Sequence, residues 1–438
     1  MKIKYVIFSL FLIMLLGHSA VLYGEDSKIK DIGFYSFKNT ETCQKINETD
    51  DTYHQGRTYG SANNPKFSFF DKFTNDATYE LFSSPDFSAK NVIYSPLSLY
   101  FSLAQLYEGA SEKNKLEFLE AMRLESFDDT TREFLQQVYY NNNYYFDKAT
   151  TRLANSIWYN TSNEAFNKVN ESYMETLTNY YNTEFYLSSY SDDDLKQMSD
   201  WIKFYTGDLI KQPTNFELPK DILFVILSTI YFNHKWATPF SKTDNFRDLF
   251  NNEKEVEYIK HRIIDDYIFE DDYTLIVDSF SYGSIKYYVP TEEYLSEHEL
   301  YELLEQNILR YRDKEDYDQG KIHLSVPKFK LEQEIVLNDL LKSLGVKDAY
   351  IDNGNKFNQS AVVREPSAVW LDDVRQQLFF ELNEEGVKAT VATTSCVKAM
   401  PTAAPPMEEF DFIVNRPFIF EICGSFGEPL FVGMINEL

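Results

Sequence analysis

The spacing of hydrophobic residues changes along the chain from a helical period to patterns typical of strands. Aromatic residues between positions 67 and 82 recur at near-helical spacing, and a second helix is expected over residues 96–107, ending before Gly109. Residues 222–232 (ILFVILSTIYF) form a long apolar run, which predicts a buried central strand. Further strands are expected at residues 274–277, 285–289, 323–326 and 377–382, and further helices at 295–308 and 334–344. Helices that dominate the first half and strands that dominate the second favour an α+β fold.

The first 24 residues have the order of features found in secretory signal peptides. Lys2 and Lys4 precede an apolar run over residues 5–16, and small residues follow up to Gly24. A membrane anchor is the alternative, but His18 interrupts the run, and a span needs about 20 apolar residues. We therefore expect a signal peptide at 1–24, a polar N-terminal extension at 25–65 and one folded domain at 66–438, in a secreted, extracellular chain without a membrane span.

Charge and motif content exclude several classes of function. The chain has 69 acidic and 42 basic side chains and a formal charge of −27, so nucleic acid and heparin are poor partners. No glycine-rich phosphate loop occurs and no two histidines have the spacing of a metal pair, so neither a cofactor nor a metal is expected. Cys43, Cys396 and Cys423 are too few for a disulfide framework, and Cys396 is interpreted as a free thiol rather than a nucleophile.

Four Asn-x-Ser/Thr sequons are candidate glycan sites on a secretory route. They begin at Asn47, Asn160, Asn170 and Asn358. An unused sequon is the alternative at each position.

A polar stretch of nearly thirty residues follows Glu384 and lies between two apolar strands. Compact domains rarely keep such a loop unless it has a function or is disordered. Its first half alternates with a period of two, as a strand does. One set is small or β-branched and the other carries the charges: Val387, Ala389, Val391, Thr393, Ser395 and Val397 against Lys388, Thr390, Ala392, Thr394, Cys396 and Lys398. No proline occurs in it before Pro401, so this segment could pair on both edges inside a sheet.

Six motifs are spread along the chain, namely NVIYSPLSL (91–99), ILSTIYFNHKW (226–236), VPKFKLE (326–332), ELNEEGVKATVA (381–392), FIVNRPF (412–418) and PLFVGMI (429–435). They occur in the order found in serpins, and the chain resembles a secreted member of that family. The resemblance implies one α+β domain with three β-sheets, about nine helices and an exposed reactive loop at about 386–408. It also implies a monomeric inhibitor, not an enzyme: a serine protease cuts the loop, which inserts into the main sheet while the protease stays attached as an acyl-enzyme. A non-inhibitory serpin, such as a carrier or storage protein, and an unrelated secreted hydrolase are the alternatives.

The resemblance assigns a hinge, where insertion begins, to Gly386, Val387, Lys388, Ala389, Thr390, Val391 and Ala392. Lys388 stands where the family usually has glutamate, and Thr390 and Val391 replace smaller residues. Lys388 belongs to the outward set and should stay solvated. Val391 belongs to the inward set and would slow insertion. The small inward residues favour inhibition over the non-inhibitory alternative.

The resemblance also assigns residues around the opening of the main sheet, namely Ser95, Ser98, Ser228, Gln376, Trp236, Lys328 and Glu384. Ser228 and Gln376 stand where asparagine and histidine are usual, so the polar cluster is altered. An ion pair between Glu384 and Lys328 would guard the entry point. A core aromatic for Trp236 and a solvent-weakened surface contact for the ion pair are the simpler interpretations.

The scissile bond is less clear, because the family's count from Gly386 places it after Met400, directly before Pro401. Most serine proteases do not cleave before proline, and counting back from Asn415 places the bond several residues later. The candidate residues are Lys398, Ala399, Met400, Pro401, Ala403 and Ala404. Small and medium apolar residues predict an elastase-like or chymotrypsin-like target, with a trypsin-like protease acting at Lys398 as the alternative.

Overall fold

The computed structural model describes residues 34–35, 65–146, 149–207, 209–210, 221–236, 240, 243–264, 266–280, 282–310, 317–318, 321–364, 367–387, 409–424 and 427–438. The expected signal peptide, nearly all of the N-terminal extension and residues 388–408 of the reactive loop lie outside these ranges.

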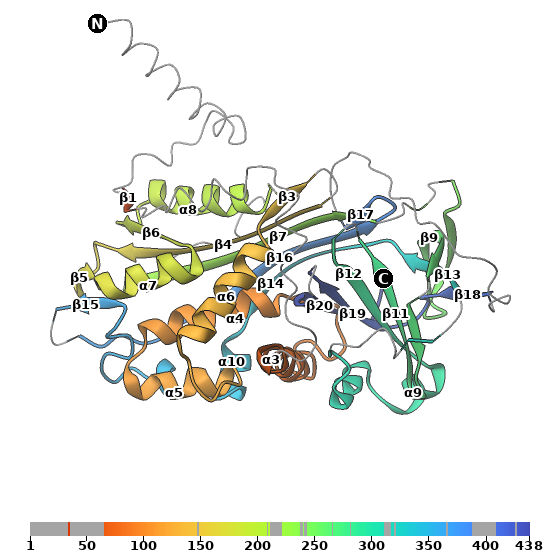
Figure 1. Ribbon diagram of the computed structural model, residues 1–438, viewed down its shortest axis with the longest axis horizontal. Helices are drawn as coiled ribbons and strands as arrows, with labels where there is room; N and C mark the ends of the chain where they lie inside the picture. The colour runs from red at the N-terminus through yellow and green to blue at the C-terminus, as the bar shows by residue number, and fades with distance from the viewer. Residues whose placement is uncertain are drawn as a thin grey trace, which may run out of the picture.

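An eight-stranded main sheet crosses the molecule (Figure 1). Its spatial order is β1-β6-β4-β7-β17-β16-β14, with β3 paired to β4. The predicted central strand is confirmed as β7, which lies between β4 and β17. The strands are β1 (Phe34–Tyr35), β3 (Tyr144–Phe146), β4 (Ala149–Asn160), β6 (Thr183–Ser188), β7 (Phe224–Lys235), β14 (Phe329–Val336), β16 (Arg375–Asn383) and β17 (Gly386–Val387).

Two further sheets and a small ladder complete the strands of the described residues. The six-stranded sheet has the order β10 (Tyr267–Phe269), β11 (Tyr273–Ser279), β12 (Ser284–Pro290), β19 (Phe418–Cys423), β20 (Pro429–Ile435) and β2 (Val92–Tyr94). The four-stranded sheet has the order β18 (Glu409–Ile413), β13 (Lys321–Pro327), β9 (Lys254–Ile264) and β8 (Phe246–Phe250). A two-stranded ladder joins β15 (Ala361–Val363) to β5 (Phe166–Val169).

Helices cover both faces of the main sheet, with α8 on one face and α4, α6 and α7 on the other (Figure 1). The helices are α3 (Pro65–Phe82), α4 (Pro96–Gly109), α5 (Glu112–Ala121), α6 (Asp129–Asn141), α7 (Glu171–Tyr181), α8 (Asp192–Tyr205), α9 (Glu292–Glu297) and α10 (Asn338–Ser343), with 3₁₀ segments η2 (Leu300–Gln306) and η4 (Asp348–Tyr350). The α+β prediction is therefore confirmed.

Two helix predictions need correction. The segment predicted as one helix at 295–308 is divided between α9 and η2, with His298 extended between them. The helix predicted at 334–344 begins later, because β14 continues to Val336 and α10 starts at Asn338. The boundary between β14 and α10 is set by the hydrogen-bonded pairing of β14 with β16, which extends to Val336. Periodicity within a segment does not reveal pairing with a distant strand.

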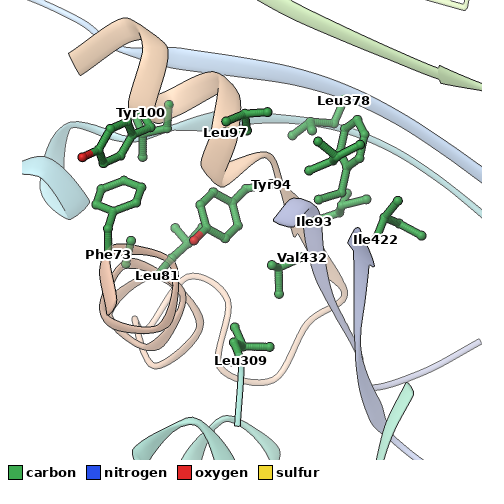
Figure 2. Packing of buried hydrophobic residues seen from close by; sticks show 14 of the residues in the cluster. Phe73, Leu81, Ile93, Tyr94, Leu97, Tyr100, Leu309, Leu378, Ile422 and Val432 are labelled. Carbon is green, nitrogen blue, oxygen red and sulfur yellow. The ribbon is translucent and has the colours of Figure 1, made fainter. Parts of the chain in front are cut away.

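The central helix α4 packs with α3 against two sheets and forms much of the core (Figure 2). Its start is specified locally: Ser95 is the N-cap and accepts a hydrogen bond from the Ser98 N–H, and Pro96 follows at the first helical position. Tyr94 is fully buried beside α3, and its hydroxyl lies 2.7 Å from Thr78 Oγ1. A tyrosine can be enclosed in this way because its polar end has a partner.

Candidate functional site

The main sheet contains a slot between β7 and β16. At one end of the slot, β17 lies between them: Gly386 pairs with Lys235 and Asn383, and Val387 pairs with His234 and Leu382. Beyond β17, the ladders of the described residues include none between β7 and β16. A cavity of about 1050 Å³ lies there instead, lined by residues 222–232 and 374–381 and by Val387. The slot therefore extends from Gly386 and Val387 in the direction in which β17 runs.

The β16 wall of the slot alternates in burial as a strand that covers a core should, whereas residues 224–231 of β7 are all partly exposed. On β16, Gln376, Leu378, Phe380 and Leu382 are buried, and the residues between them are partly exposed. Val387 continues the inner row, at 5% exposure. The expectation that Val387 faces inward therefore agrees with its place in the sheet.

Gly386 occupies a backbone position that a side chain would not fit. Its φ is +147°, and a Cβ atom built there would lie 2.1 Å from the carbonyl oxygen of His234 and 2.7 Å from Cα of Lys235. Both obstacles are main-chain atoms, which cannot rotate away. Glycine therefore allows the hinge backbone to approach β7 closely enough to form β17.

An ionic cluster lies beside the entry to the slot. Lys328 Nζ is 3.0 Å from Glu384 Oε1 and 3.2 Å from Glu257 Oε1. The amide of Asn245 donates to both carboxylates. Burial opposes charge on Glu384, but hydrogen bonds from its own main chain, Lys328 and Asn245 hold its pKa below the usual value. The expected Glu384–Lys328 pair is thus present, and sequence reasoning missed Asn245 and Glu257, which no local motif marks.

Trp236 lies under the turn that leads into the hinge. Its side chain is 1% exposed, its Nε1 donates to the Asn383 carbonyl at 2.8 Å, and its ring stacks on Phe280 at 5.0 Å. The main-chain N–H of Trp236 also donates a hydrogen bond to the Glu385 carbonyl. Trp236 is therefore both a core aromatic and a support for residues 383–385, so the two interpretations of this residue are compatible.

The predicted polar cluster lies at the base of the slot. The Gln376 side chain accepts from the Ser95 N–H at 2.9 Å and donates to the Ser95 carbonyl at 2.9 Å. Ser95 Oγ donates to the Leu430 carbonyl, and Ser98 Oγ donates to the Ser228 carbonyl at 3.0 Å. The structure thus brings Ser95, Ser98, Ser228 and Gln376 together.

His234, which sequence reasoning did not select, is fully buried where β7 meets β17. Nδ1 lies 2.5 Å from the Tyr282 carbonyl, and Nε2 lies 2.9 Å from Thr151 Oγ1 and 3.2 Å from the Tyr144 hydroxyl. Because a carbonyl only accepts, Nδ1 carries the proton and Nε2 accepts. Burial lowers the pKa of His234 to about 3, so the ring is neutral near pH 7.

Other predicted residues are placed less centrally. Lys388, Ala389, Thr390, Val391, Ala392 and all scissile candidates lie outside the described residues, as do Asn47, Cys43 and Cys396. Cys423 is a buried free thiol. Asn160 is 1% exposed and donates to the Ile222 carbonyl, so the fold leaves no room for a glycan there. Asn358 is exposed and Asn170 caps α7.

The described residues contain no cluster of three or more His, Cys, Asp or Glu side chains suited to a metal ion. None of their helices is both long and apolar enough to cross a membrane.

Comparisons with known proteins point to one family. The family model described as serpin (serine protease inhibitor) matches residues 71–438. Iripin-2 from Ixodes ricinus is 27% identical, with 81% of this chain and 89% of that protein covered. Human alpha-1-antichymotrypsin is 24% identical, with 78% and 81% covered.

Solved structures agree in fold. The thermophilic serpin tengpin in its native state has a TM-score of 0.72 at 21% identity, with 86% of this chain and 95% of tengpin covered. Serpin48 from Tenebrio molitor has a TM-score of 0.70 at 22% identity, with 86% and 100% covered.

Proposed function

This chain belongs to the serpin family, and from that premise we propose that it is an inhibitory member that traps a serine protease by loop insertion. The observation that carries the proposal is the slot: β17 already lies between β7 and β16, and an unfilled cavity continues its line. A strand that enters there would gain main-chain hydrogen bonds on both edges, which favours insertion over remaining outside.

The register of β17 relates the loop sequence to the slot walls. If insertion continues that register, apolar inward residues meet apolar walls and the one polar inward residue in this stretch meets the polar cluster. Ala389 would lie between Phe232 and Phe380, Val391 between Ile230 and Leu378, and Thr393 between Ser228 and Gln376. This match supports an inserting loop, since a loop without that role has no need to complement the slot.

Lys388 fits the same register on the outer face. It would lie between Asn233 and Glu381, so its ammonium group would meet a carboxylate across the strands. Opposite charges on directly paired residues stabilise a sheet by roughly 0.2–1 kcal/mol. The departure of Lys388 from the family's usual glutamate therefore suits this particular slot.

The non-inhibitory alternative predicts a slot that stays empty after the loop is cut. The relatives include alpha-1-antichymotrypsin and plasminogen activator inhibitor 2, whose names describe inhibitors. For this chain, the small inward residues and the matching register favour inhibition.

We further propose that the chain is secreted and acts as a monomer on an extracellular protease. The signal-like first 24 residues support secretion. The loop composition supports an elastase-like or chymotrypsin-like target, with a trypsin-like protease at Lys398 as the alternative. Mass spectrometry of the C-terminal peptide released on cleavage would identify the scissile bond.

The test is incubation of the purified chain with pancreatic elastase, chymotrypsin and trypsin, followed by denaturing electrophoresis. Inhibition by trapping leaves a complex that resists SDS, because the acyl bond is covalent. A matched control is Ala389→Pro, which removes a ladder donor from the inserting strand and should convert the inhibitor into a substrate. Cleavage of the wild-type chain by all three proteases without any stable complex would argue for the non-inhibitory class.

A further inference from the structure

Two of the four candidate glycan sites lie next to each other in the folded chain. Asn170 directly follows β5, whose last residue, Val169, pairs with Ala361 of β15. The main-chain N–H of Asn170 donates to the Ser360 carbonyl at 3.1 Å. Ser360 is the third residue of the sequon that begins at Asn358. The β5–β15 ladder thus brings together two sequons that are far apart in the sequence.

The amide nitrogen of Asn170 is available for a sugar. Oδ1 of Asn170 accepts a hydrogen bond from the Ser172 N–H at 3.1 Å, as the N-cap of α7. In the described part of the chain, Nδ2 of Asn170 has no hydrogen-bond acceptor. An N-linked glycan is attached to Nδ2 and leaves Oδ1 unchanged, so the helix cap and the glycan are compatible.

Asn358 meets the same requirements in a different local structure. Its side chain is exposed, and its Oδ1 accepts from Gln359 Nε2 at 3.0 Å. Its Nδ2 also has no acceptor among the residues that the structure describes. Phe357 and Ser360 are buried, which fixes the backbone of this turn while the Asn358 side chain stays in solvent. A glycan on Asn358 would therefore displace no contact of the fold.

Asn160 shows that local conformation alone does not distinguish the sites. Its Oδ1 accepts from the Ser162 N–H at 3.0 Å, which is the same turn that Asn170 makes with Ser172. However, Nδ2 of Asn160 donates to the Ile222 carbonyl at 3.1 Å, and the residue is 1% exposed. A close-packed interior has no room for a sugar. Because glycans are attached before folding is complete, a chain modified at Asn160 would fail to reach this fold.

The two sequons lie away from the parts of the molecule that would meet a protease. Figure 1 shows β5 and β15 together at one end, and β18, where the described chain resumes after the loop, at the other. The slot cavity reaches Ala165 and Arg364, at the opposite end of the ladder from Asn170. At about 3.3 Å per residue, the length of β5 separates the two ends by roughly 13 Å. Glycans on this pair would leave the slot and the loop accessible.

We propose that Asn170 and Asn358 carry N-linked glycans, as an adjacent pair at one end of the ladder, and that Asn160 is unmodified in the folded chain. The assignment rests on the proposed secretion and not on protease trapping. The donor is a lipid-linked oligosaccharide diphosphate. Nδ2 forms a bond to the anomeric carbon of the first sugar, the bond from that carbon to the lipid diphosphate breaks, and one amide proton is released.

The test compares two matched variants, Ser172→Ala and Ser162→Ala. Both serines are exposed, and each is the hydroxyl residue of its sequon. Each substitution keeps the asparagine and the main-chain N–H that bonds to it, so only the sequon is lost. Asn358→Gln removes the remaining sequon of the proposed pair at an exposed position.

Two measurements are made on the full chain collected from the medium of eukaryotic cells. The first is denaturing electrophoresis before and after treatment with a peptide N-glycosidase. Ser172→Ala and Asn358→Gln should each lose one glycan, whereas Ser162→Ala should migrate with the wild type. The second is mass spectrometry after the glycosidase has acted in water enriched in heavy oxygen, which converts each modified asparagine to a labelled aspartate. We expect label at Asn170 and Asn358 and unmodified asparagine at Asn160.

Unmodified asparagine at position 170 or 358 of the chain in the medium, or label at position 160, would overturn the assignment and leave the inhibitory function intact. If the wild type stays inside the cells, its first 24 residues are replaced by the signal peptide of a secreted reporter protein. The same peptides then decide the assignment, and only the proposed secretion fails. Neither measurement depends on whether the chain traps a protease.

Discussion

At the scale of single residues, the slot depends on a few positions whose chemistry is set by their surroundings. Gly386 is needed because main-chain atoms of β7 occupy the place of a side chain. His234 is neutral because it is enclosed beside Tyr144 and Tyr282. Glu384 remains charged through its hydrogen-bonding partners despite partial burial. Gly386 and His234 each lead to a prediction, and in each case a residue of the same type elsewhere in the chain serves as the control.

The first prediction concerns Gly386→Ala. The new Cβ would meet the His234 carbonyl oxygen at 2.1 Å, so β17 should detach from β7, at a cost of roughly 1–3 kcal/mol for a strained backbone. Protease should then be trapped less efficiently, with more of the inhibitor cleaved. Gly354→Ala is the matched control, because Gly354 also has positive φ, at +90°, but a Cβ added there would meet nothing within 4 Å. Equal losses in both variants would show that close approach to β7 is not the reason.

The second prediction concerns pH. The pKa of His234 is about 3 in the folded chain and 6.5 ordinarily, so the unfolded chain binds a proton that the folded chain excludes. Stability should therefore fall as pH drops below the ordinary value, by at most about 1.4 kcal/mol per pH unit, until the folded pKa is reached. His234→Gln should flatten the fall in urea midpoint between about pH 7 and about pH 5. Exposed His298 provides the control, and a steeper fall in His234→Gln than in His298→Gln would contradict the assignment.

At the scale of elements, the hinge strand β17 and the segment that follows it in sequence have to match two walls at once. If insertion continues the register of β17, the inward residues would meet a row that changes from apolar to polar, and the outward residue Lys388 would meet Glu381. A shift of the register by one residue would send every side chain to the other face. The register set by Gly386 and Val387 is therefore decisive for the whole insertion.

The third prediction tests this register through Lys388→Glu. A glutamate would face Glu381 across the strands, and like charges paired directly destabilise a sheet by roughly 0.2–1 kcal/mol. Insertion should slow, and the stoichiometry of inhibition should rise. The double variant Lys388→Glu with Glu381→Gln should restore trapping, because it removes the like charge without opposing Lys330, which pairs with residue 381 from β14. Its failure to do so would indicate a different register.

At the scale of the whole molecule, the main sheet is incomplete while the loop is outside it. Two cores stabilise the rest: the large one around α3 and α4, and a smaller one under α8 built on Trp158, Tyr186 and Trp201. Neither fills the slot, which retains a cavity of about 1050 Å³. Under the proposed function, the folded chain would reach a lower-energy arrangement once the loop is cut, because the inserted strand would fill this cavity.

The fourth prediction follows from that incompleteness. Limited cleavage within the loop should raise the melting temperature, since the inserted segment would add hydrogen bonds on both edges and fill the cavity. Calorimetry before and after cleavage measures the change. Ala389→Pro, cut at the same bond, should show a much smaller rise. An unchanged melting temperature in the wild type would favour the non-inhibitory alternative.

The sequence by itself determined the α+β class, the family and the central strand, because each is written in local periodicity or in contiguous motifs. The period-2 pattern after Gly386 likewise predicted which hinge residues face inward, and Val387 agrees. Only the tertiary structure decided the burial of Asn160 and the neutrality of His234. It also decided the hydrogen bonds of the Asn245 amide to two carboxylates and those of the Gln105 side chain to Ser228 and Thr183. Gln105 and Thr183 are 78 residues apart, as are many partners in a sheet assembled from distant strands. Local pattern reports which face a residue prefers, but a partner far along the chain is set by how the strands and helices pack together.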